Sequence, residues 1–283
     1  MRRTRPASGL ILLPFLWACG EADSPPEETP AAALSEHEHA MSELPAALRG
    51  EAPPLAGTDV SYHEADPAST GYLAVPEGEG PFPAVILIHE WNGLVDRVRE
   101  VADALAAEGY VALAADLFSG RTGSNPDENM ALVRGVRDNP EAFIANLDAA
   151  VAFLRARPDV TGRVGAMGWC FGGGVALTYG LDGVDHEATA IFYGALLDDP
   201  EILSGLTHEV YGTFARLDQG PSPDQVDAFA RALEAAGVPA DLHIYDEVNH
   251  GFWLHVDQDP EARAAPALDA WQRLTAYLER TLR

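Results

Sequence analysis

The sequence predicts an α/β fold: a doubly wound, mostly parallel sheet with helices on both faces. Apolar, strand-like runs alternate with segments whose apolar residues recur at helical spacing, as repeated strand–helix units require. The run at 83–89, PAVILIH, is continuously apolar, which is typical of a central strand covered on both faces. At 163–179 a strand-like run, a glycine-rich turn and a helix-like run follow one another directly. Residues 57–283 therefore suit one domain of this class.

The first half of this domain is predicted to contain two strands and two helices. After the strand at 83–89, residues 98–108 have helical spacing and end at Gly109, a residue type that commonly closes helices. Residues 110–114 form the next apolar run. Apolar residues at helical spacing then predict a helix over 143–154.

The second half repeats the pattern. Four apolar runs predict strands at 163–168, 188–193, 209–214 and 240–245. Helical spacing predicts a helix around 226–233, closed by Gly237, and a final helix around 271–278. Ligands of such sheets bind at the carboxyl ends of the strands, so residues just after strands are the first candidates for chemistry.

The N-terminus resembles an export signal. Three arginines precede an apolar stretch, 10–18, which is too short to span a bilayer. The following sequence, Leu16-Trp17-Ala18-Cys19-Gly20, resembles a bacterial lipobox, although Trp17 is bulky for such a site and cleavage elsewhere is the alternative. We therefore expect residues 1–18 to be a lipoprotein signal peptide. Cys19 would carry lipid and anchor the exported protein to a membrane, in the periplasm or at the cell surface.

Residues 19–56 are rich in Glu, Pro and Ala, without a sustained helical or strand period. This composition predicts a disordered acidic tether before the domain at 57–283. His37 and His39 within it could bind a metal, but a solvated linker is the preferred interpretation. We expect no metal site.

The formal charge of the chain is −26, and every one of its 18 basic residues is arginine. So acidic a chain argues against nucleic-acid partners and against electrostatic docking to anionic lipid. A saline habitat is one interpretation of this composition.

The glycine-rich turn at 168–174, GWCFGGG, is the most informative motif. A Gly-x-Cys-x-Gly sequence between a strand and a helix has the context of a nucleophile elbow, with a thiol in place of the usual hydroxyl. The alternative is a buried free cysteine beside a turn. If Cys19 carries lipid, Cys170 has no disulfide partner, so in an oxidising compartment it must be buried or used.

Two further strand ends carry the groups that a nucleophilic cysteine needs. Asp218 follows the predicted strand at 209–214, and His250 follows the one at 240–245. The order Cys170, Asp218, His250 is the nucleophile–acid–base order of α/β-hydrolases. A histidine can take the thiol proton, and a carboxylate can orient that histidine. Taken singly, Asp218 could be a turn residue or helix cap, and His250 an ordinary loop histidine.

Four segments in order resemble the dienelactone hydrolase family over residues 70–283. They are HEWNGL at 89–94, EGY at 108–110 with Asp116-Leu117 after the next strand, GWCFGG at 168–173, and NHGF at 249–252. The resemblance implies an α/β-hydrolase fold and a Cys-His-Asp triad at Cys170, His250 and Asp218.

The same resemblance implies roles for three neighbouring residues. Glu90 would hold or deprotonate the resting thiol, so that a strong nucleophile forms mainly when substrate binds. The backbone N–H groups of Phe171 and Trp91 would form the oxyanion hole. An ordinary carboxylate at a strand end is the less favoured alternative for Glu90.

The chain departs from the family at one point. Lactone-cleaving members bind a substrate carboxylate through arginines, one of them shortly after the catalytic histidine, whereas Phe252-Trp253-Leu254-His255 follows His250 here. Arg121 and Arg134 lie where another such arginine could sit. The aromatic residues near the motifs suggest an apolar pocket wall that includes Phe252 and Trp253, although aromatic side chains are usually part of a core.

These observations favour an enzyme that cleaves a small ester or lactone through a thioester on Cys170, as a monomer and without metal or organic cofactor. A tethered binding protein that kept the fold without turnover is the alternative. A thiol redox role is less favoured, because the chain offers no second cysteine near Cys170 to form a disulfide.

Overall fold

The computed structural model describes residues 30–283, with side chains from residue 37 onward. One eight-stranded sheet runs through the molecule in the order β1-β2-β4-β3-β5-β6-β7-β8. The strands are β1 (Thr58–Ser61), β2 (Thr70–Ala74), β3 (Phe82–Ile88), β4 (Val111–Ala115), β5 (Val160–Trp169), β6 (Ala188–Phe192), β7 (Val210–Ala215) and β8 (Ala240–Tyr245). The six strands from β3 to β8 pair in parallel, which confirms the predicted mostly parallel sheet.

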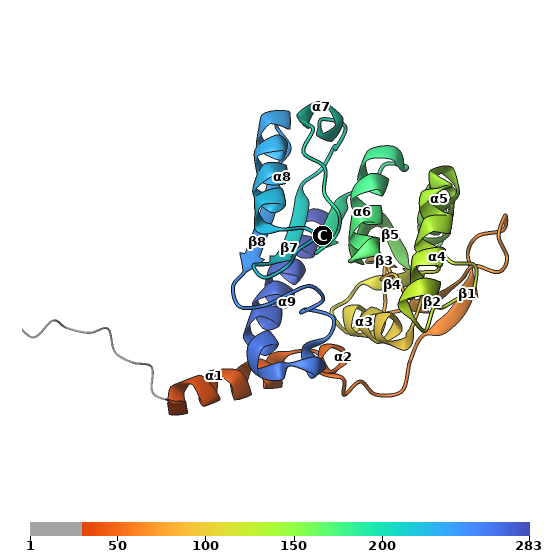
Figure 1. The fold of residues 1–283 in the computed structure, drawn as a ribbon. Coiled ribbons are helices and arrows are strands. Elements are labelled where there is room, and N and C mark those ends of the chain that lie inside the picture. Colours follow the sequence, from red (N-terminus) through yellow and green to blue (C-terminus); the bar gives the residue numbers. More distant parts are fainter. Residues whose placement is uncertain (1–29) are drawn as a thin grey trace, which may run out of the picture.

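Helices cover both faces of the sheet (Figure 1). The helices are α1 (Pro30–Glu43), α2 (Ala46–Arg49), α3 (Asp96–Ala107), α4 (Pro126–Arg137), α5 (Pro140–Arg155), α6 (Phe171–Asp182), α7 (Pro200–Leu203), α8 (Pro223–Ala236), the 3₁₀ turn η1 (Val256–Gln258) and α9 (Pro260–Leu282). The side chains of β3 alternate between the two faces: Val85 and Leu87 join the core under α3 and α9, and Ala84, Ile86 and Ile88 join the core under α5 and α6. This double burial explains the continuous apolar run.

The expected helix ends are present where glycine allows a left-handed backbone. Gly109 follows α3 with φ +88°, and Gly237 closes α8 with φ +73°. The helix α8 begins at a capping box, in which Ser222 and Gln225 satisfy each other's backbone N–H groups.

Two strands and several short helices were not expected from the sequence. β1 and β2 form an antiparallel edge, and β1 is largely exposed, so it lacks the apolar run that marks a buried strand. The helix α4 carries a glycine and charged residues, but Asn125 caps its start and Pro126 occupies the first turn.

The prediction of a disordered tether over 19–56 is wrong for residues 30–49. Ala40, Leu44 and Leu48 recur every four residues and are at least 97% buried in the core that contains α3 and α9. The guanidinium of Arg97 donates to the carbonyls of Ala47 at 2.7 Å and Leu48 at 3.3 Å. The second half of this segment is therefore part of the folded unit. The predicted signal peptide and Cys19 lie outside the described residues.

Candidate active site

Cys170 is the single residue that connects the end of β5 to the start of α6, and its backbone has φ +55° and ψ −114°. A non-glycine residue at positive φ is strained and persists only where its surroundings enforce it. Here the neighbouring glycines, which have no side chain, let the backbones of β3, β5 and α6 approach one another closely. A Cβ on Gly168 would lie 2.3 Å from the carbonyl oxygen of Gly172, and a Cβ on Gly172 would lie 2.2 Å from that of Ile88. The turn therefore has the geometry of a nucleophile elbow and presents the partly exposed thiol at the carboxyl edge of the sheet.

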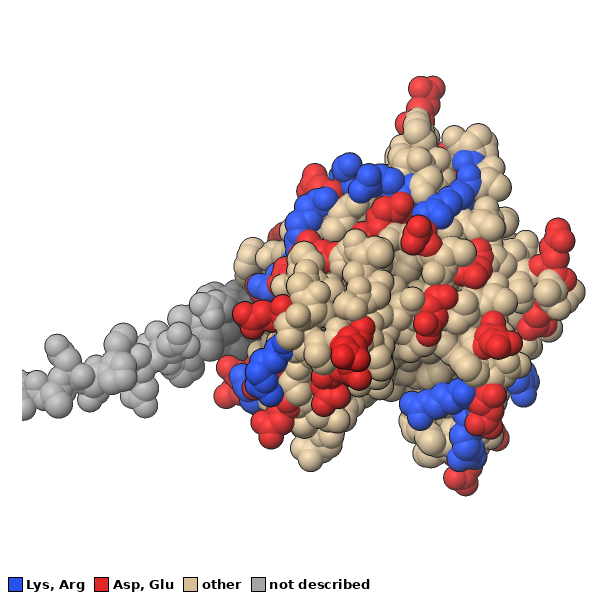
Figure 2. All heavy atoms as spheres, turned by 90° about the horizontal axis from the view of Figure 1, so that it is seen from above, with Lys and Arg blue, Asp and Glu red and all other residues tan. Residues whose placement is uncertain are grey.

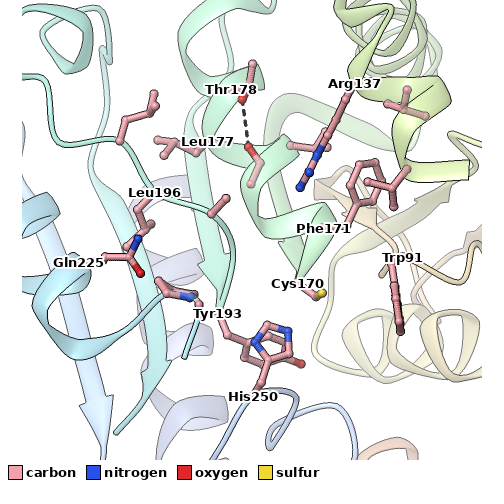
Figure 3. Close-up of a pocket in the computed structure, with 18 of the residues that line it drawn as sticks. Trp91, Arg137, Cys170, Phe171, Leu177, Thr178, Tyr193, Leu196, Gln225 and His250 are labelled. Carbon is pink, nitrogen blue, oxygen red and sulfur yellow. Dashed lines mark hydrogen bonds between the residues drawn. The ribbon is translucent and has the colours of Figure 1, made fainter. Parts of the chain in front are cut away.

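His250 and Asp218, which follow β8 and β7, meet beside this thiol. The Nδ1 atom of His250 lies 2.7 Å from Oδ2 of Asp218. Asp218 is buried, and its other carboxylate oxygen accepts a hydrogen bond from the N–H of Gly220 at 2.9 Å. The imidazole of His250 is 38% exposed and projects into the same cavity as Cys170 (Figure 3). The structure thus brings together the three residues expected from their order in the sequence.

The charge on His250 is set by its neighbours. Burial by itself lowers the pKa of His250, but hydrogen bonds to Asp218 and Cys170, together with the charges of these two groups, raise it to about 10. The imidazolium form of His250 is thereby stabilised beside Cys170.

Replacing Asp218 by asparagine is expected to lower the pKa of His250 by at least about one unit, because the carboxylate that favours imidazolium is lost while burial remains. NMR titration of the imidazole nitrogens measures this pKa directly. His208 is the internal control, since burial lowers its pKa to about 4 in a cluster away from Asp218. An unchanged titration of His250 in the variant would contradict the role assigned to Asp218.

Glu90 reaches the site, but its direct partner is a histidine. Its Oε2 lies 2.9 Å from Nε2 of His255, and the Glu90 carboxylate is almost fully buried. Tyr193 lines the same cavity as Cys170, and burial, then the charges of Glu90 and Cys170, raise the pKa of its phenol well above the ordinary value. The tyrosine ring also meets the ring of His250 edge-on, with centroids 4.9 Å apart. Glu90 and Cys170 therefore both influence the ionisation of the buried Tyr193 phenol. The Glu90 carboxylate itself is paired with His255.

Two arginines fix the loop that carries His250 and His255. From α9, Arg263 donates to the carbonyl of His255 at 2.7 Å and to the side chain of Asn249 at 3.1 Å. From α3, Arg97 donates to the carbonyl of Leu254 at 3.3 Å, in addition to its contacts with α2. His255, Tyr193 and these arginines had no role expected from the sequence. The partners of the arginines depend on the tertiary fold, and both arginines lie outside the helical ranges expected from the sequence, 98–108 and 271–278.

The residues expected to supply the oxyanion hole both line the cavity. Phe171 is the first residue of α6, where backbone N–H groups have no partner within the helix. Trp91 lies in the turn after β3, next to Glu90. Both are thus at the same end of the sheet as Cys170.

The cavity beside Cys170 has a volume of about 490 Å³. Its walls are mainly apolar and come from α4, α5, α6 and the segment after β6, with Arg137 as the arginine among them. Arg121 and Arg134, the arginines considered from the sequence, do not line it.

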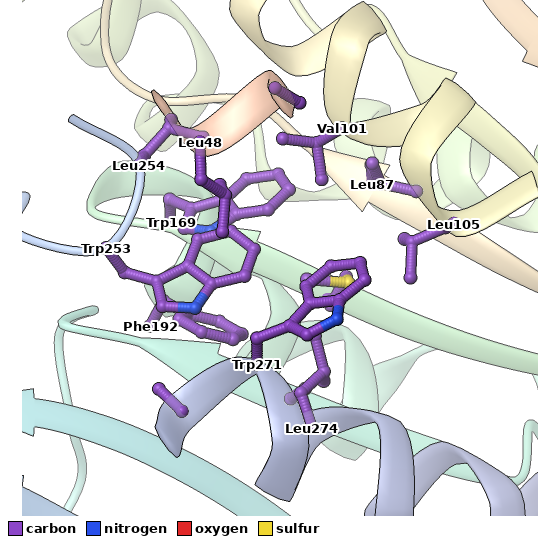
Figure 4. Packing of buried hydrophobic residues seen from close by; sticks show 14 of the residues in the cluster. Leu48, Leu87, Val101, Leu105, Trp169, Phe192, Trp253, Leu254, Trp271 and Leu274 are labelled. Carbon is purple, nitrogen blue, oxygen red and sulfur yellow. The ribbon is translucent and has the colours of Figure 1, made fainter. Parts of the chain in front are cut away.

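The predicted position of Phe252 and Trp253 in the pocket wall is corrected by the structure. Both side chains are completely buried and neither lines the cavity. The Trp253 ring stacks on the Trp169 ring, with ring centroids 5.7 Å apart, and packs against the Phe192 ring, with centroids 4.6 Å apart. These rings lie within the core under α9 (Figure 4). The chain turns after His250, so that the next side chains point inward and away from the thiol.

The surface in Figure 2 carries acidic side chains across the visible face, with arginines interspersed among them. Within residues 30–283 no cluster of three His, Cys, Asp or Glu side chains is placed to bind a metal ion. Over the same range, no helix combines the length and apolar character needed to cross a membrane.

A parallel sheet with a strained residue at its strand–helix elbow, and an acid and a histidine at the next strand ends, defines the α/β-hydrolase class. Comparison with known proteins agrees: the model of the dienelactone hydrolase family matches residues 69–282. The chain belongs to the dienelactone hydrolase family and is a hydrolase of the ester and lactone type.

Individual relatives are moderately similar. The chain is 31% identical over 233 residues to the protein named "Putative carboxymethylenebutenolidase" of Methylorubrum extorquens, covering 78% of this chain and 79% of that protein. It is 29% identical to Protein usf of Aquifex pyrophilus, covering 75% and 93%. Among solved structures, the dienelactone hydrolase-like phosphotriesterase P91 from metagenomic libraries superposes with a TM-score of 0.72 at 22% identity, covering 81% and 99%, a likeness in fold.

Proposed function

We propose that this hydrolase cleaves its ester or lactone through a thioester on Cys170, with His250 as base and Asp218 as the carboxylate that orients His250. The observation that carries the proposal is the elbow thiol at φ +55° beside an imidazole whose Nδ1 lies 2.7 Å from Asp218. With Nδ1–H directed to the carboxylate, Nε2 is the nitrogen left to exchange a proton with sulfur.

In the first half of the reaction the thiol proton passes to His250 and the sulfur attacks the carbonyl carbon. The resulting oxyanion is stabilised by the N–H groups of Phe171 and Trp91, each worth about 3 kcal/mol in the barrier. The carbon–oxygen bond then breaks, the leaving alcohol takes the proton from His250, and the acyl group remains on sulfur. In a lactone the alcohol and acyl group stay parts of one molecule.

In the second half His250 takes a proton from water, and the hydroxide formed attacks the thioester. The sulfur leaves as the carboxylic acid forms and recovers its proton from His250. Glu90 is proposed to relay the thiol proton to His250 once the Glu90 carboxylate is released from His255. The support is that the charges of Glu90 and Cys170 both raise the pKa of the same buried Tyr193 phenol.

Capture of the acyl-enzyme tests the proposal. The chain is mixed with a slowly hydrolysed aryl ester, quenched in acid and digested, and the peptide that contains Cys170 is weighed. We expect one acyl mass on this peptide during turnover and none in Cys170→Ala. Turnover without acyl mass on Cys170, or acyl mass on another residue, would overturn the mechanism.

A further inference from the structure

The cavity is extended along one helix face. The residues of α6 that line it include Phe171, Gly174, Val175 and Thr178, and their spacing of three or four places them on a single face. From Cys170 to Thr178 this face rises about 12 Å, at about 1.5 Å per residue. The acyl groove, as we call the part of the cavity over these four residues, therefore begins at the thiol and follows the helix for two turns.

The walls of the acyl groove are apolar on both sides. The helix α4 contributes Met130, Val133 and Val136, and the segment after β6 contributes Leu196 and Leu197 on the other side. Met130 and Leu197 are 38% and 37% exposed, so apolar side chains continue to the rim of the cavity. A ligand that covered them would remove apolar surface from water, which is favourable in proportion to the area buried.

Two of the polar side chains in these walls are already engaged. The hydroxyl of Thr178 donates to the carbonyl of Gly174 at 3.1 Å. The side-chain oxygen of Gln225 accepts from the N–H of Ser222 at 2.9 Å in the cap of α8. Arg137 reaches over the cavity from the end of α4 (Figure 3), and because its side chain is exposed, water can still reach its guanidinium. The groove thus offers contact area and few new hydrogen bonds.

The position of His250 decides which part of an ester enters the groove. His250 must protonate the leaving alcohol, so the alcohol lies on the His250 side of Cys170. Thr178, at the far end of the acyl groove, lies on the opposite side of Cys170 from His250 (Figure 3). The acyl group, which stays on sulfur, is therefore the part directed along α6.

We propose that the natural substrate carries an elongated, uncharged apolar acyl group, and that Val175 and Val133 determine its length. The inference rests on the proposed function, because it orients the acyl group from the role of His250. Val175 is almost buried on the α6 side, and Val133 faces the cavity from α4. A larger side chain at either position would fill the groove beyond the thiol.

The test compares p-nitrophenyl acetate, butyrate and octanoate, so that the alcohol stays constant. In the wild type we expect kcat/KM to rise at least about tenfold from acetate to octanoate, since each added methylene becomes buried. In Val175→Phe, and separately in Val133→Phe, the ratio of octanoate to acetate should fall about tenfold. Val184→Phe, which adds the same volume at an exposed site outside the cavity, should keep the wild-type ratio.

A flat or falling series in the wild type would overturn the inference, as would an unchanged ratio in both blocking variants. If octanoate esters with a terminal carboxylate were preferred over the neutral esters, the natural acyl group would not be uncharged. Arg137 would then be the residue that binds the carboxylate of the acyl group. Alkylation of Cys170 by iodoacetamides of increasing N-alkyl length measures the groove without turnover. If the alkylation rate depended on chain length but no ester were hydrolysed, the proposed function would be overturned. The inference that the groove binds an apolar chain would still hold.

Discussion

Replacing Cys170 by alanine is expected to reduce kcat/KM for a short aryl ester at least about a thousandfold, with the melting temperature nearly unchanged. The loss follows because no other group at the elbow can form a covalent intermediate, and triad residues act as a unit. The fold should survive because alanine keeps the Cβ that already sits at φ +55°. Steady-state hydrolysis and thermal unfolding of the two proteins measure both quantities.

The serine variant is the matched control for this prediction. Cys170→Ser keeps the size of the side chain but replaces a thiol with a hydroxyl that is much harder to deprotonate, so its activity should lie between those of the wild type and the alanine variant. Cys170 is the one free cysteine among the described residues, so loss of iodoacetamide labelling in that part of the chain reports the same site. Equal rates in the wild type and Cys170→Ala would place the chemistry elsewhere.

The parallel part of the sheet could be predicted because its strands are buried on both faces. Residues 83–89 form a continuous apolar run, whereas a surface strand would alternate apolar and polar residues. The ends of two helices could be predicted as well, because Gly109 and Gly237 adopt a left-handed backbone that glycine favours. The edge strand β1 could not be predicted in this way. Its residues are mostly exposed, and its pairing with β2 comes from the backbone and not from an apolar pattern.

The packing of residues 40–49 was missed for a different reason. Six of these ten residues are apolar, but three of the six are alanine and the surroundings are rich in Glu and Pro, so the composition of residues 19–56 as a whole is that of a tether. What fixes it lies far away in sequence: Leu48 joins the core with Leu254, and Arg97 links α2 to the loop after His250. Local sequence contains no sign of such partners.

The triad candidates could be found because parallel strands bring their carboxyl ends to one edge, so three residues after three strands must be near one another. The pairing of Glu90 with His255 could not be found in this way, since these residues are 165 positions apart and only side-chain direction joins them. The same limit explains Phe252 and Trp253. Their closeness to His250 in sequence says nothing about the turn that sends both rings into the core.

The second large effect concerns the backbone of the elbow. Replacing Gly172 by alanine is expected to destabilise the protein by at least about 3 kcal/mol, because a Cβ there would lie 2.2 Å from the carbonyl oxygen of Ile88 and 2.5 Å from that of His89. The oxygen of Ile88 cannot move cheaply, since Ile88 ends β3, which pairs with β4 and β5 on its two sides. Urea unfolding measures the loss, and residual soluble protein should have a displaced thiol and much lower activity.

Gly135→Ala provides the matched control, because Gly135 is also helical but no atom lies within 4 Å of the position its Cβ would take. At that site alanine is expected to stabilise the protein slightly, by about 0.5–1 kcal/mol, through its higher helix propensity. The two substitutions add the same methyl group to a helix, so opposite signs isolate the close approach of α6 to β3. If Gly172→Ala were as stable as the control, the elbow would tolerate a wider turn. The strain at Cys170 would then be a property of the cysteine alone and not of the surrounding glycines.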